Sequence, residues 1–598
     1  MDEEVEGLIP QKPTGSFVRR SVDLFFAILA ISAITLFSLA LGLVIGLNVS
    51  WVRPSLGLNR AATVHQNTSL GAPPQLVDDA FVPIDRLVNA TELDLRTGFN
   101  ISTASTTREY TFHLGQAYAA PDGFRKPMIL INGQSPGPLI EANVGDTIRV
   151  HVINQMANAS TSIHWHGIDQ KNTTWMDGVT GVSQCAIPPG SNFTYEFRII
   201  DQRGTFWYHA HTSIQYSDGM FGPIIIHDPD EMIPEYDDEK IVFLGDVYHT
   251  DGTSLLQSYL QPGSKWSPEE AGVEPLPDNF LMNGQHEFNC SIRSSTWPSP
   301  FTRESRPWSR PNCTGGRLYT TSVKPGHVVR LRLINHSSYM SFWFSIDNHT
   351  LTIVEIDGVE VEPITDRGVY VNVGQRYSVL VRADGPPGRY QMRATLPQTC
   401  FVPYCPYTST GLESIGYQAR GILSYLDEDG AGQHNGTQAG HSTPSPPLLG
   451  VAGNTSNPYG VSTNHLRGKV WEGCDDMPFD MPVPKRKRPA VEVDEDNCHS
   501  VAFQFQQVGE INRIFINRTS WAAYQEDAQI WQAMEQSFTP GNGGSYNNWG
   551  FRLDQQVLLI PKAGRGAQIA INSRDIMEHP FHFHGNYLAL VSSLALCV

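Results

Sequence analysis

Three pairs of histidines, each separated by a single residue, are the part of this sequence best suited to chemistry. The pairs are His164-Trp165-His166, His209-Ala210-His211 and His582-Phe583-His584. Random placement of 20 histidines in 598 residues would give fewer such pairs. Because residues i and i+2 of a β-strand project from the same face, each pair aims two imidazoles at one point. Six imidazoles, with no thiolate or carboxylate beside them in the sequence, favour copper, or less specifically zinc or nickel.

A seventh histidine, His579, lies just before the third pair and is followed by Pro580. Proline cannot donate a hydrogen bond to a neighbouring strand, so it interrupts the strand at this point. The side chain of His579 is therefore expected to leave the face that carries His582 and His584. A second metal centre would require this placement.

The histidine pairs belong to a longer pattern that occurs three times. Each copy begins with an apolar residue and Asn, at 131–132, 282–283 and 516–517, and continues with an alternating run that ends in Asn154, Asn335 or Asn572. In the first and third copies the two histidines follow this last Asn by 10 and 12 residues. The second copy carries Phe342 and Phe344 instead. A threefold repeat predicts three copies of one structural unit.

Alternating apolar residues within each copy predict β-strands. Ile148, Val150 and Val152 alternate with polar residues, and turns drawn from 52 Gly and 41 Pro separate such runs. We therefore expect an all-β chain with sandwich domains at 106–235, 238–426 and 498–598, and a linker at 427–497. Helix is expected only in an apolar segment near the N-terminus and in a short stretch within 520–536. The basic run 485–488 is expected to be a solvated loop.

Composition excludes two broad classes of protein. With 42 Lys and Arg against 60 Asp and Glu, the formal charge is −18, so the chain has no basic surplus for binding a nucleic-acid backbone. With 40% hydrophobic and 10% aromatic residues the chain can bury substantial cores, so wholesale disorder is excluded as well.

The N-terminal region predicts attachment to a membrane. Residues 24–47 form an unbroken apolar segment that can cross a hydrocarbon core of about 30 Å and is longer than the apolar part of a cleavable signal peptide. Basic residues are slightly more numerous before this segment than after it, which favours a cytoplasmic tail at 1–23. Residues 48–105, polar and without periodicity, are expected to be a glycosylated stalk.

Glycosylation sequons and cysteines agree with this topology. All fourteen Asn-X-Ser/Thr sequons and all eight cysteines follow the apolar segment. We therefore expect a single-pass membrane protein whose bulk is lumenal or extracellular. Cys290 with Cys313 and Cys400 with Cys405 are plausible local disulfides, but eight cysteines allow many pairings and no set is chosen. Cys498 is expected to be a disulfide partner.

Three motifs carry a resemblance to a known family. Ile163-His-Trp-His-Gly-Ile, Gly204-Thr-Phe-Trp-Tyr-His-Ala-His-Thr and His579-Pro-Phe-His-Phe-His-Gly resemble the first three copper motifs of the multicopper oxidases, most closely those of the fungal laccase and ferroxidase branches. The resemblance extends over almost everything from Arg108 onward. It implies three cupredoxin-like Greek-key β-sandwich domains, the third incomplete here, and four copper ions in a complete member.

The resemblance also implies roles for individual residues. His164 and His582 would hold the type 2 copper, and His579 would be one ligand of the type 1 copper. The type 3 pair would be bound by His166, His209, His211 and His584. Asp177 matches the acidic residue that assists proton delivery to the trinuclear cluster, although an Asp before a Gly is also an ordinary turn residue.

The family's reaction is the one-electron oxidation of phenolic or similar donors, coupled to the four-electron reduction of dioxygen to water. Its ferroxidases carry a Gln-Tyr-Glu-Asp-Gly run whose Glu helps to bind Fe(II), a hard cation that prefers carboxylate oxygen. In this sequence Ser217 stands at the position of the Glu, and Asp218 keeps the Asp. The substitution of Ser for Glu predicts a laccase-like preference for organic donors, with a ferroxidase as the alternative.

The family's fourth motif, His-Cys-His, is absent. Residues 585–598 contain no histidine, so the type 1 site would keep one ligand of three. A truncated gene model or a retained intron is expected, and the chain as written is expected to be inactive. A non-catalytic copper-binding relic is the competing interpretation. A zinc hydrolase is more remote, because no His-Glu-X-X-His motif is present.

Overall fold

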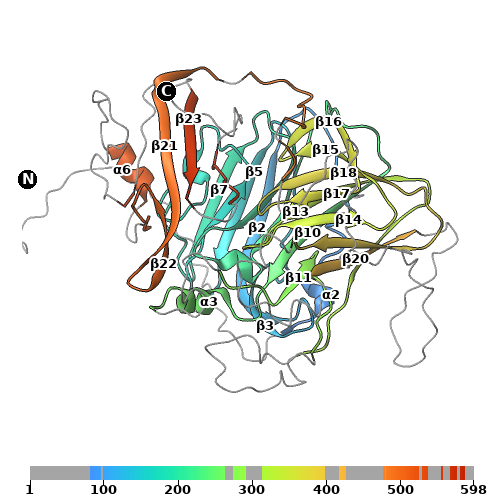
Figure 1. Ribbon diagram of the computed structural model, residues 1–598, viewed down its shortest axis with the longest axis horizontal. Coiled ribbons are helices and arrows are strands. Elements are labelled where there is room, and N and C mark those ends of the chain that lie inside the picture. The colour runs from blue at the N-terminus through green and yellow to red at the C-terminus, as the bar shows by residue number, and fades with distance from the viewer. Residues whose placement is uncertain are drawn as a thin grey trace, which may run out of the picture. The chain divides into compact units, whose positions relative to one another are not determined.

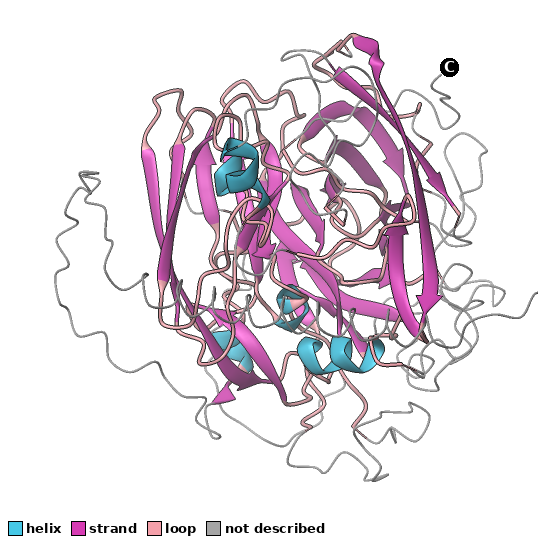
Figure 2. Cartoon of the chain, turned by 90° about the vertical axis from the view of Figure 1, so that its left-hand side faces the viewer, coloured by secondary structure: helices cyan, strands magenta, loops and turns pink. Residues whose placement is uncertain are grey.

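The computed structural model describes residues 81–95, 98–262, 274–290, 313–397, 417–425, 476–478, 480–489, 491–523, 528–535, 554–555, 566–574 and 579–585. They all belong to one compact unit, Gly71–Val598. Strands dominate, with a few short helices (Figure 2). The expected tail at 1–23 and anchor at 24–47 lie outside these residues, and no helix in the described part is long and apolar enough to cross a membrane.

The first sandwich packs two sheets around one apolar core. In β5, the fully buried Ile148, Val150 and Val152 alternate with the partly exposed Arg149 and His151, as predicted. One sheet has the order β1-β2-β5-β7 with β3 on β2, and the other β4-β9-β8-β6. The elements are β1 (Phe81–Val82), α2 (Ile84–Leu87), β2 (Thr107–Ala119), β3 (Lys126–Ile131), β4 (Ile140–Asn143), β5 (Thr147–Asn154), β6 (Ile163–His166), η1 (Thr174–Met176), β7 (Asn192–Arg198), β8 (Gly204–Ala210), η2 (Gln215–Asp218) and β9 (Phe221–His227).

The second sandwich is larger and repeats this arrangement. Its sheets have the orders β11-β10-β13-β18-β15-β16 and β12-β20-β19-β14-β17. Phe342 and Phe344 on β14 are fully buried in its core. They therefore lie on the core face of their strand, as Ile163 and Trp165 do on β6, and not on the face that carries the histidines of the first copy. The elements are β10 (Asp238–Val247), α3 (Gly252–Tyr259), β11 (Asn279–Met282), β12 (Tyr319–Val323), β13 (Val328–Asn335), β14 (Phe342–Ile346), β15 (Leu351–Ile356), β16 (Val359–Asp366), β17 (Gly368–Val371), β18 (Arg376–Arg382), β19 (Arg389–Thr395) and β20 (Gln418–Tyr425).

The third copy is a sheet of three described strands, drawn in orange and red in Figure 1. Its elements are β21 (Val493–Val508), β22 (Ile511–Ile516), α6 (Gln529–Glu535) and β23 (Gly566–Ser573). Strand β21 pairs antiparallel with β22 and parallel with β23, as β2 does with β3 and β5, and β10 with β11 and β13. Strands β7 and β18 extend the first two copies, and the described residues of the third copy contain no equivalent strand. Helix α6 lies within the stretch where a short helix was expected.

One turn confirms the threefold repeat at the level of side chains. In each copy an Asn adopts a left-handed backbone conformation, and its Oδ1 accepts a hydrogen bond from a backbone N–H of the preceding strand. The three are Asn132 (φ 54°, from His113, 2.8 Å), Asn283 (φ 48°, from Phe243, 2.7 Å) and Asn517 (φ 49°, from Ala502, 2.8 Å). Asn tolerates this conformation better than most residues, which explains why it recurs.

The expected stalk at 48–105 differs from the structure in its last part. Leu87, Val88 and Leu93 are buried in a cluster with Trp207 of the first sandwich and Phe243 of the second. Residues 81–95 are therefore packed against the folded unit. Ile84, Leu87 and Val88 have helical spacing and fall at α2, but this helix is only four residues long, so the periodicity was too short to reveal the packing. Residues 48–80 lie outside the described part of the chain.

The basic run 485–488 is not the freely solvated loop that was expected. The backbone N–H of Lys485 donates to Glu360 O at 2.9 Å, and Arg486 Nε pairs with the Glu360 carboxylate at 3.0 Å. Arg488 donates to Asp201 O in the first sandwich at 3.1 Å. The sequence prediction failed because the buried Glu360, which partners the run, lies more than a hundred residues away.

Two predictions about modified side chains meet different outcomes. The Cys290–Cys313 disulfide is present, whereas Cys400 and Cys405 lie outside the described residues. Asn335, one of the fourteen sequons, is fully buried, and its Nδ2 donates to two backbone carbonyls at 2.9 Å. This Asn therefore cannot carry a glycan in the folded protein. Cys498 lies on β21, with Sγ 3.7 Å from a Gln568 side-chain oxygen.

Candidate metal centre

Strands β6 and β8 place three of the histidines side by side. The strands pair antiparallel, with His164 opposite His209 and His166 opposite Trp207. Trp165 is fully buried in the core of the first sandwich, so its two neighbours on β6 project from the other face. His164, His166 and His209 are all buried. Alternation along two paired strands therefore creates the imidazole-lined surface that the spacing predicted.

The third pair reaches the same surface from residues 579–585, which are neither helix nor strand. His584 stacks on His164 with ring centroids 3.7 Å apart, and His582 stacks on His166 at 3.8 Å. His211, one residue beyond β8, lies with its ring centroid 5.0 Å from that of His584. Six imidazoles from three chain segments thus converge.

Two groups of three histidines have ring nitrogens close enough to share a metal ion. Within each group the nitrogens lie within 4.8 Å of one another: His164 with His582 and His584, and His164 with His166 and His209. In the described part of the chain these are the only such groups. His164 belongs to both groups, so the two possible metal positions are adjacent.

Hydrogen bonds at Nδ1 leave Nε2 as the lone-pair nitrogen of three rings, and that of His209 lies 3.4 Å from Nδ1 of His166. Nδ1 of His164 lies 2.9 Å from Asp177 O, Nδ1 of His209 lies 2.9 Å from Ala210 O, and Nδ1 of His584 lies 2.8 Å from Asp177 Oδ2. Because these oxygens only accept, each Nδ1 carries the proton and Nε2 keeps its lone pair. Nε2 of His164 is buried without a hydrogen-bond partner among the described atoms. A metal ion is the partner that such an atom lacks.

Asp177 joins two of the three chain segments. It follows η1 and precedes Gly178, so it is a turn residue as well as a neighbour of the cluster. One carboxylate oxygen lies 3.2 Å from Nδ1 of His164 and the other 2.8 Å from Nδ1 of His584. Burial opposes ionisation of this carboxyl, but hydrogen bonds from His164 and His584 outweigh burial and hold its pKa well below the usual range.

The electrostatics of the cluster favour neutral imidazoles. Burial, followed by the mutual repulsion of neighbouring rings, lowers the pKa of His166 and His209 far below the ordinary value. The same causes lower the pKa of His211 to about 3. Neutral imidazole is the form that binds a metal ion, so at neutral pH these rings need not lose a proton first.

His579 stays apart from the six, as predicted. Its ring lies against Phe503 and Phe505 of β21, with centroids 4.7 and 5.3 Å away. Pro580 separates it from the converging pair. These contacts of His579 with the third sheet do not test its role as a type 1 copper ligand. That role stays a prediction from the resemblance.

Sequence reasoning missed a contribution of the second sandwich. A Cβ added to Gly374 would lie 2.9 Å from Cε1 of His166, and one added to Gly167 would lie 2.5 Å from an Arg376 nitrogen. The buried Arg376 guanidinium therefore abuts the end of β6. No local spacing marks Gly374 or Arg376, because their contacts span some two hundred residues.

Comparisons with known proteins match this geometry. Models of the multicopper oxidase family match residues 113–231 and 238–419. Laccase-1 of Cryptococcus neoformans var. grubii is 31% identical over 533 residues, which cover 87% of this chain and 75% of that protein. The chain belongs to the multicopper oxidase family. Among the solved structures of multicopper oxidases, the laccase from Botrytis aclada aligns with a TM-score of 0.55 and 31% identity, over 74% of this chain and 69% of that one.

A multicopper oxidase of iron import aligns with a slightly lower identity. Fet3p, described as a multicopper oxidase that functions in iron import, aligns with a TM-score of 0.53 and 26% identity, over 70% of this chain and 65% of that one. The family is copper-binding, and an all-imidazole donor set with an unpartnered, buried Nε2 fits copper. This multicopper oxidase is therefore laccase-like, with a mostly-β fold of stacked sheets like that of its relatives.

Proposed function

We propose that the six converging histidines form the dioxygen-reducing copper centre of a laccase-like oxidase. His164 and His582 would hold the type 2 copper, and His166, His209, His211 and His584 the type 3 pair. Bound copper would supply one-electron redox chemistry. The observation that carries this proposal is the convergence of β6, β8 and residues 579–585, with Nδ1 atoms bonded outward and a buried Nε2 left without a partner.

The residues around the histidines would orient the ligands and manage protons. Asp177, bonded to the rings of His164 and His584, would keep both in the tautomer that presents Nε2 inward. Its carboxylate lies 2.8 Å from Nδ1 of His584, beside a site where dioxygen would gain protons, and this position, not its lowered pKa, supports a role in relaying them. Asp177 is accordingly the residue to which we assign proton delivery.

The donor is proposed to be a phenol or a similar organic molecule. In the run that distinguishes ferroxidases, the hydroxyl of Ser217 donates to Ile214 O at 2.7 Å. Asp218 is buried, pairs with Lys126 at 3.0 Å and accepts from the Gly252 backbone N–H at 2.9 Å. Both oxygens of Asp218 are therefore engaged inside the protein, which supports an organic donor over Fe(II).

Copper binding is the first test. The 598-residue chain is titrated with Cu(II) and followed by electron paramagnetic resonance, together with His164→Ala and the exposed control His113→Ala. We expect Cu(II) bound in an all-nitrogen environment, lost in His164→Ala and retained in His113→Ala. Unchanged spectra in His164→Ala would contradict the proposal.

Donor preference is tested on protein purified from its native source. Oxygen consumption with a diphenol should show a higher kcat/KM than with Fe(II). A higher kcat/KM for Fe(II) would overturn the laccase-like assignment and favour a ferroxidase. Failure to consume oxygen with either donor, in protein that binds copper, would favour the non-catalytic relic.

We also propose that the protein is membrane-anchored with its bulk outside the cytosol. Several sequon asparagines are exposed and can accept glycans, namely Asn100, Asn158, Asn172, Asn192 and Asn348. Endoglycosidase treatment should increase the electrophoretic mobility of the native protein. No change in mobility, together with protease sensitivity from the cytosolic side, would contradict this topology.

A further inference from the structure

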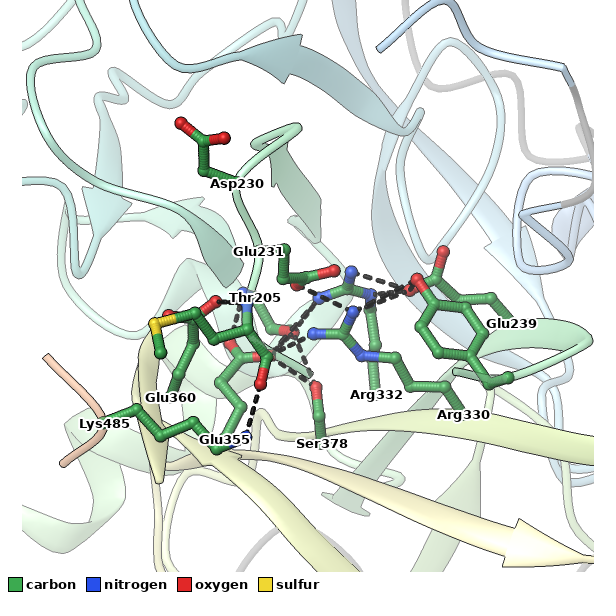
Figure 3. Close-up of polar contacts among 12 residues, drawn as sticks. Thr205, Asp230, Glu231, Glu239, Arg330, Arg332, Glu355, Glu360, Ser378 and Lys485 are labelled. Carbon is green, nitrogen blue, oxygen red and sulfur yellow. Dashed lines mark hydrogen bonds and ion pairs between the residues drawn. The ribbon is translucent and has the colours of Figure 1, made fainter. Parts of the chain in front are cut away.

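One residue of β8 is bound by three charged side chains of the second sandwich. The backbone N–H of Thr205 donates to Glu355 Oε1 at 2.6 Å, and its Oγ1 accepts from Arg332 at 2.7 Å. Its carbonyl oxygen accepts from Arg376 Nε at 3.1 Å. Every polar atom of Thr205 is thus held from the other sandwich. Figure 3 shows Thr205 lying against Glu355, Arg332 and their partners.

The side chains that hold Thr205 form a buried network. Glu355 also accepts from Arg330 and Ser378, each at 2.6 Å, and Arg332 donates to Glu239 at 2.7 Å. Glu355 and both arginines are buried. Burial opposes ionisation of Glu355, but the two arginines outweigh it and lower its pKa to about 2. The network therefore presents a fixed carboxylate and a fixed guanidinium to Thr205.

The backbone of β8 is shaped to admit this carboxylate. Gly204 adopts φ +102°, and a Cβ added there would lie 2.2 Å from Oε1 of Glu355. Any other residue would both strain the backbone and displace the carboxylate. Because Gly204 has no side chain, the Glu355 carboxylate of the second sandwich can approach β8 closely.

Thr205 connects directly to the copper ligands. It lies four residues before His209 on the same strand, so the two side chains project from the same face. Arg376, which holds its carbonyl oxygen, also abuts Gly167, the residue after His166. A shift of Thr205 would therefore move the ligand strand β8, and a shift of Arg376 would disturb the end of β6.

We propose that Glu355, Arg332 and Arg376 are positioning residues for the copper ligands on β6 and β8. The second sandwich, which has no His-X-His pair in its own repeat, would act as a fixed support for the pairs of the first. A metal site needs its ligands held within about 0.5 Å. Replacing such a network with apolar residues is often neutral or stabilising, so a role beyond stability accounts better for its burial. This inference rests on the proposed copper centre.

The test compares Cu(II) binding and stability in matched variants of the full chain. Thr205→Val removes the Arg332 contact with little change in volume, Thr205→Ser restores the hydroxyl, and Arg376→Leu removes the second hold. The control is Asp347→Asn, which breaks the Asp347–Arg393 pair (2.8 and 3.0 Å) on the opposite sheet of the same sandwich. Readouts are Cu(II) affinity, the paramagnetic resonance spectrum of bound Cu(II), and the thermal unfolding midpoint of the copper-free chain.

We expect Thr205→Val and Arg376→Leu to weaken Cu(II) binding about 10- to 100-fold, the range for partners that orient metal ligands, and to alter the spectrum. Thr205→Ser should restore both, while Asp347→Asn should lower only the unfolding midpoint. Wild-type affinity and spectrum in Thr205→Val and Arg376→Leu, with the unfolding midpoint alone lowered, would overturn the inference and leave the copper centre standing. Absence of Cu(II) from the histidines of the wild-type chain would overturn both proposals.

Discussion

At the scale of single residues, Asp177 carries the most consequence, because its two carboxylate oxygens contact histidines separated by more than four hundred residues. The sequence predicted a role for it only through family resemblance, since an Asp before Gly is common in turns. The structure shows the turn, which directs the carboxylate between the two rings, and the proton-delivery role stays a prediction. The geometry that distinguishes this Asp from an ordinary turn residue depends on a chain segment far away, which local spacing could not reveal.

Replacing Asp177 should weaken metal binding more than stability. In Asp177→Asn one accepting side-chain oxygen is replaced by a donating nitrogen, so the tautomer of His584 is held less firmly, while the backbone oxygen of residue 177 still accepts from Nδ1 of His164. We expect about a tenfold loss of Cu(II) affinity, measured by competition with a chelator. Asp230→Asn, at an exposed position, is the control and should bind Cu(II) normally. Equal affinities in the two variants would show that Asp177 does not orient the rings.

A second buried pair predicts how stability depends on pH. His249 Nε2 lies 2.8 Å from an oxygen of Asp122. Burial disfavours the charged imidazole, but Asp122 and Asp278 outweigh it and raise the pKa of His249. For Asp122 burial is outweighed mainly by His249, and the pKa is lowered. The raised pKa stabilises the fold below about 6.5 and the lowered one above about 3.9, so the pair contributes most between these values.

Asp122→Asn should therefore lower the free energy of unfolding by about 3–5 kcal/mol near pH 5, because it leaves a buried imidazole without its counter-charge. The difference from wild type should shrink as pH rises through the folded pKa of His249, and again as pH falls toward the folded pKa of Asp122. Urea unfolding of the copper-free chain across this range measures it. A difference that is constant with pH would show that the pair is not charged.

At the scale of elements, the placement of each histidine pair on one face of β6 or β8 was within reach of the sequence, whereas the pairing of the two strands and the conformation of 579–585 were not. A period of two places the histidines of β6 on one face and Trp165 on the other, and no further information is needed. The same reasoning predicted that the third pair would point at the site, and it does. The prediction assumed a strand, however, whereas residues 579–585 are not a strand. The contacts of Thr205 with Glu355 span 150 residues and leave no local signal.

A methyl group at Gly178 should displace β6. A Cβ there would lie 1.7 Å from the backbone oxygen of Ile163, beside His164, and Gly178 has φ +86°. The control is Gly190→Ala, where φ is +70° and no atom lies within 4 Å, so only the backbone strain of about 1–2 kcal/mol remains. We expect Gly178→Ala to lose clearly more free energy of unfolding than the control, and to lose Cu(II) binding. Similar losses in both variants would show that strain alone acts.

The segment 480–489 should resist proteolysis in the native protein. Its basic run offers several trypsin sites, yet Lys485 and Arg486 are held against Glu360. Glu360→Gln weakens the Arg486 pair, so cleavage after Lys485 and Arg486 should become faster, as followed by mass spectrometry of the fragments. Glu362→Gln, on the same strand, is the control. Cleavage of the wild type as fast as that of Glu360→Gln would mean that these contacts do not protect the run.

At the scale of the whole molecule, the repeat predicted three related units, and the recurring Asn turn confirms it in all three. Asn132, Asn283 and Asn517 stand at matching positions of the repeat, and each accepts the same backbone hydrogen bond. The contacts between the units could not be predicted from the sequence. The packing of residues 81–95 and the Thr205 contacts join residues that lie far apart in the sequence and belong to different sandwiches.

The copper ligands present in the sequence predict whether the copper-loaded chain is blue. A type 1 copper owes its intense blue band to a Cys thiolate, and this sequence has no His-Cys-His run to provide one beside His579. The 598-residue chain loaded with Cu(II) should therefore be nearly colourless and should not oxidise phenols. An intense blue band in the visible spectrum of the purified, copper-loaded chain would show that another cysteine serves as the ligand.

The separation of the histidine pairs along the chain also sets an order of events on the ribosome. His164 to His211 emerge together, but His582 follows roughly 370 residues later, which at bacterial to eukaryotic synthesis rates takes roughly 20–75 s. During that interval the first sandwich carries four imidazoles without their partners. The histidines of residues 579–585 can join those of β6 and β8 only after that late segment has been synthesised.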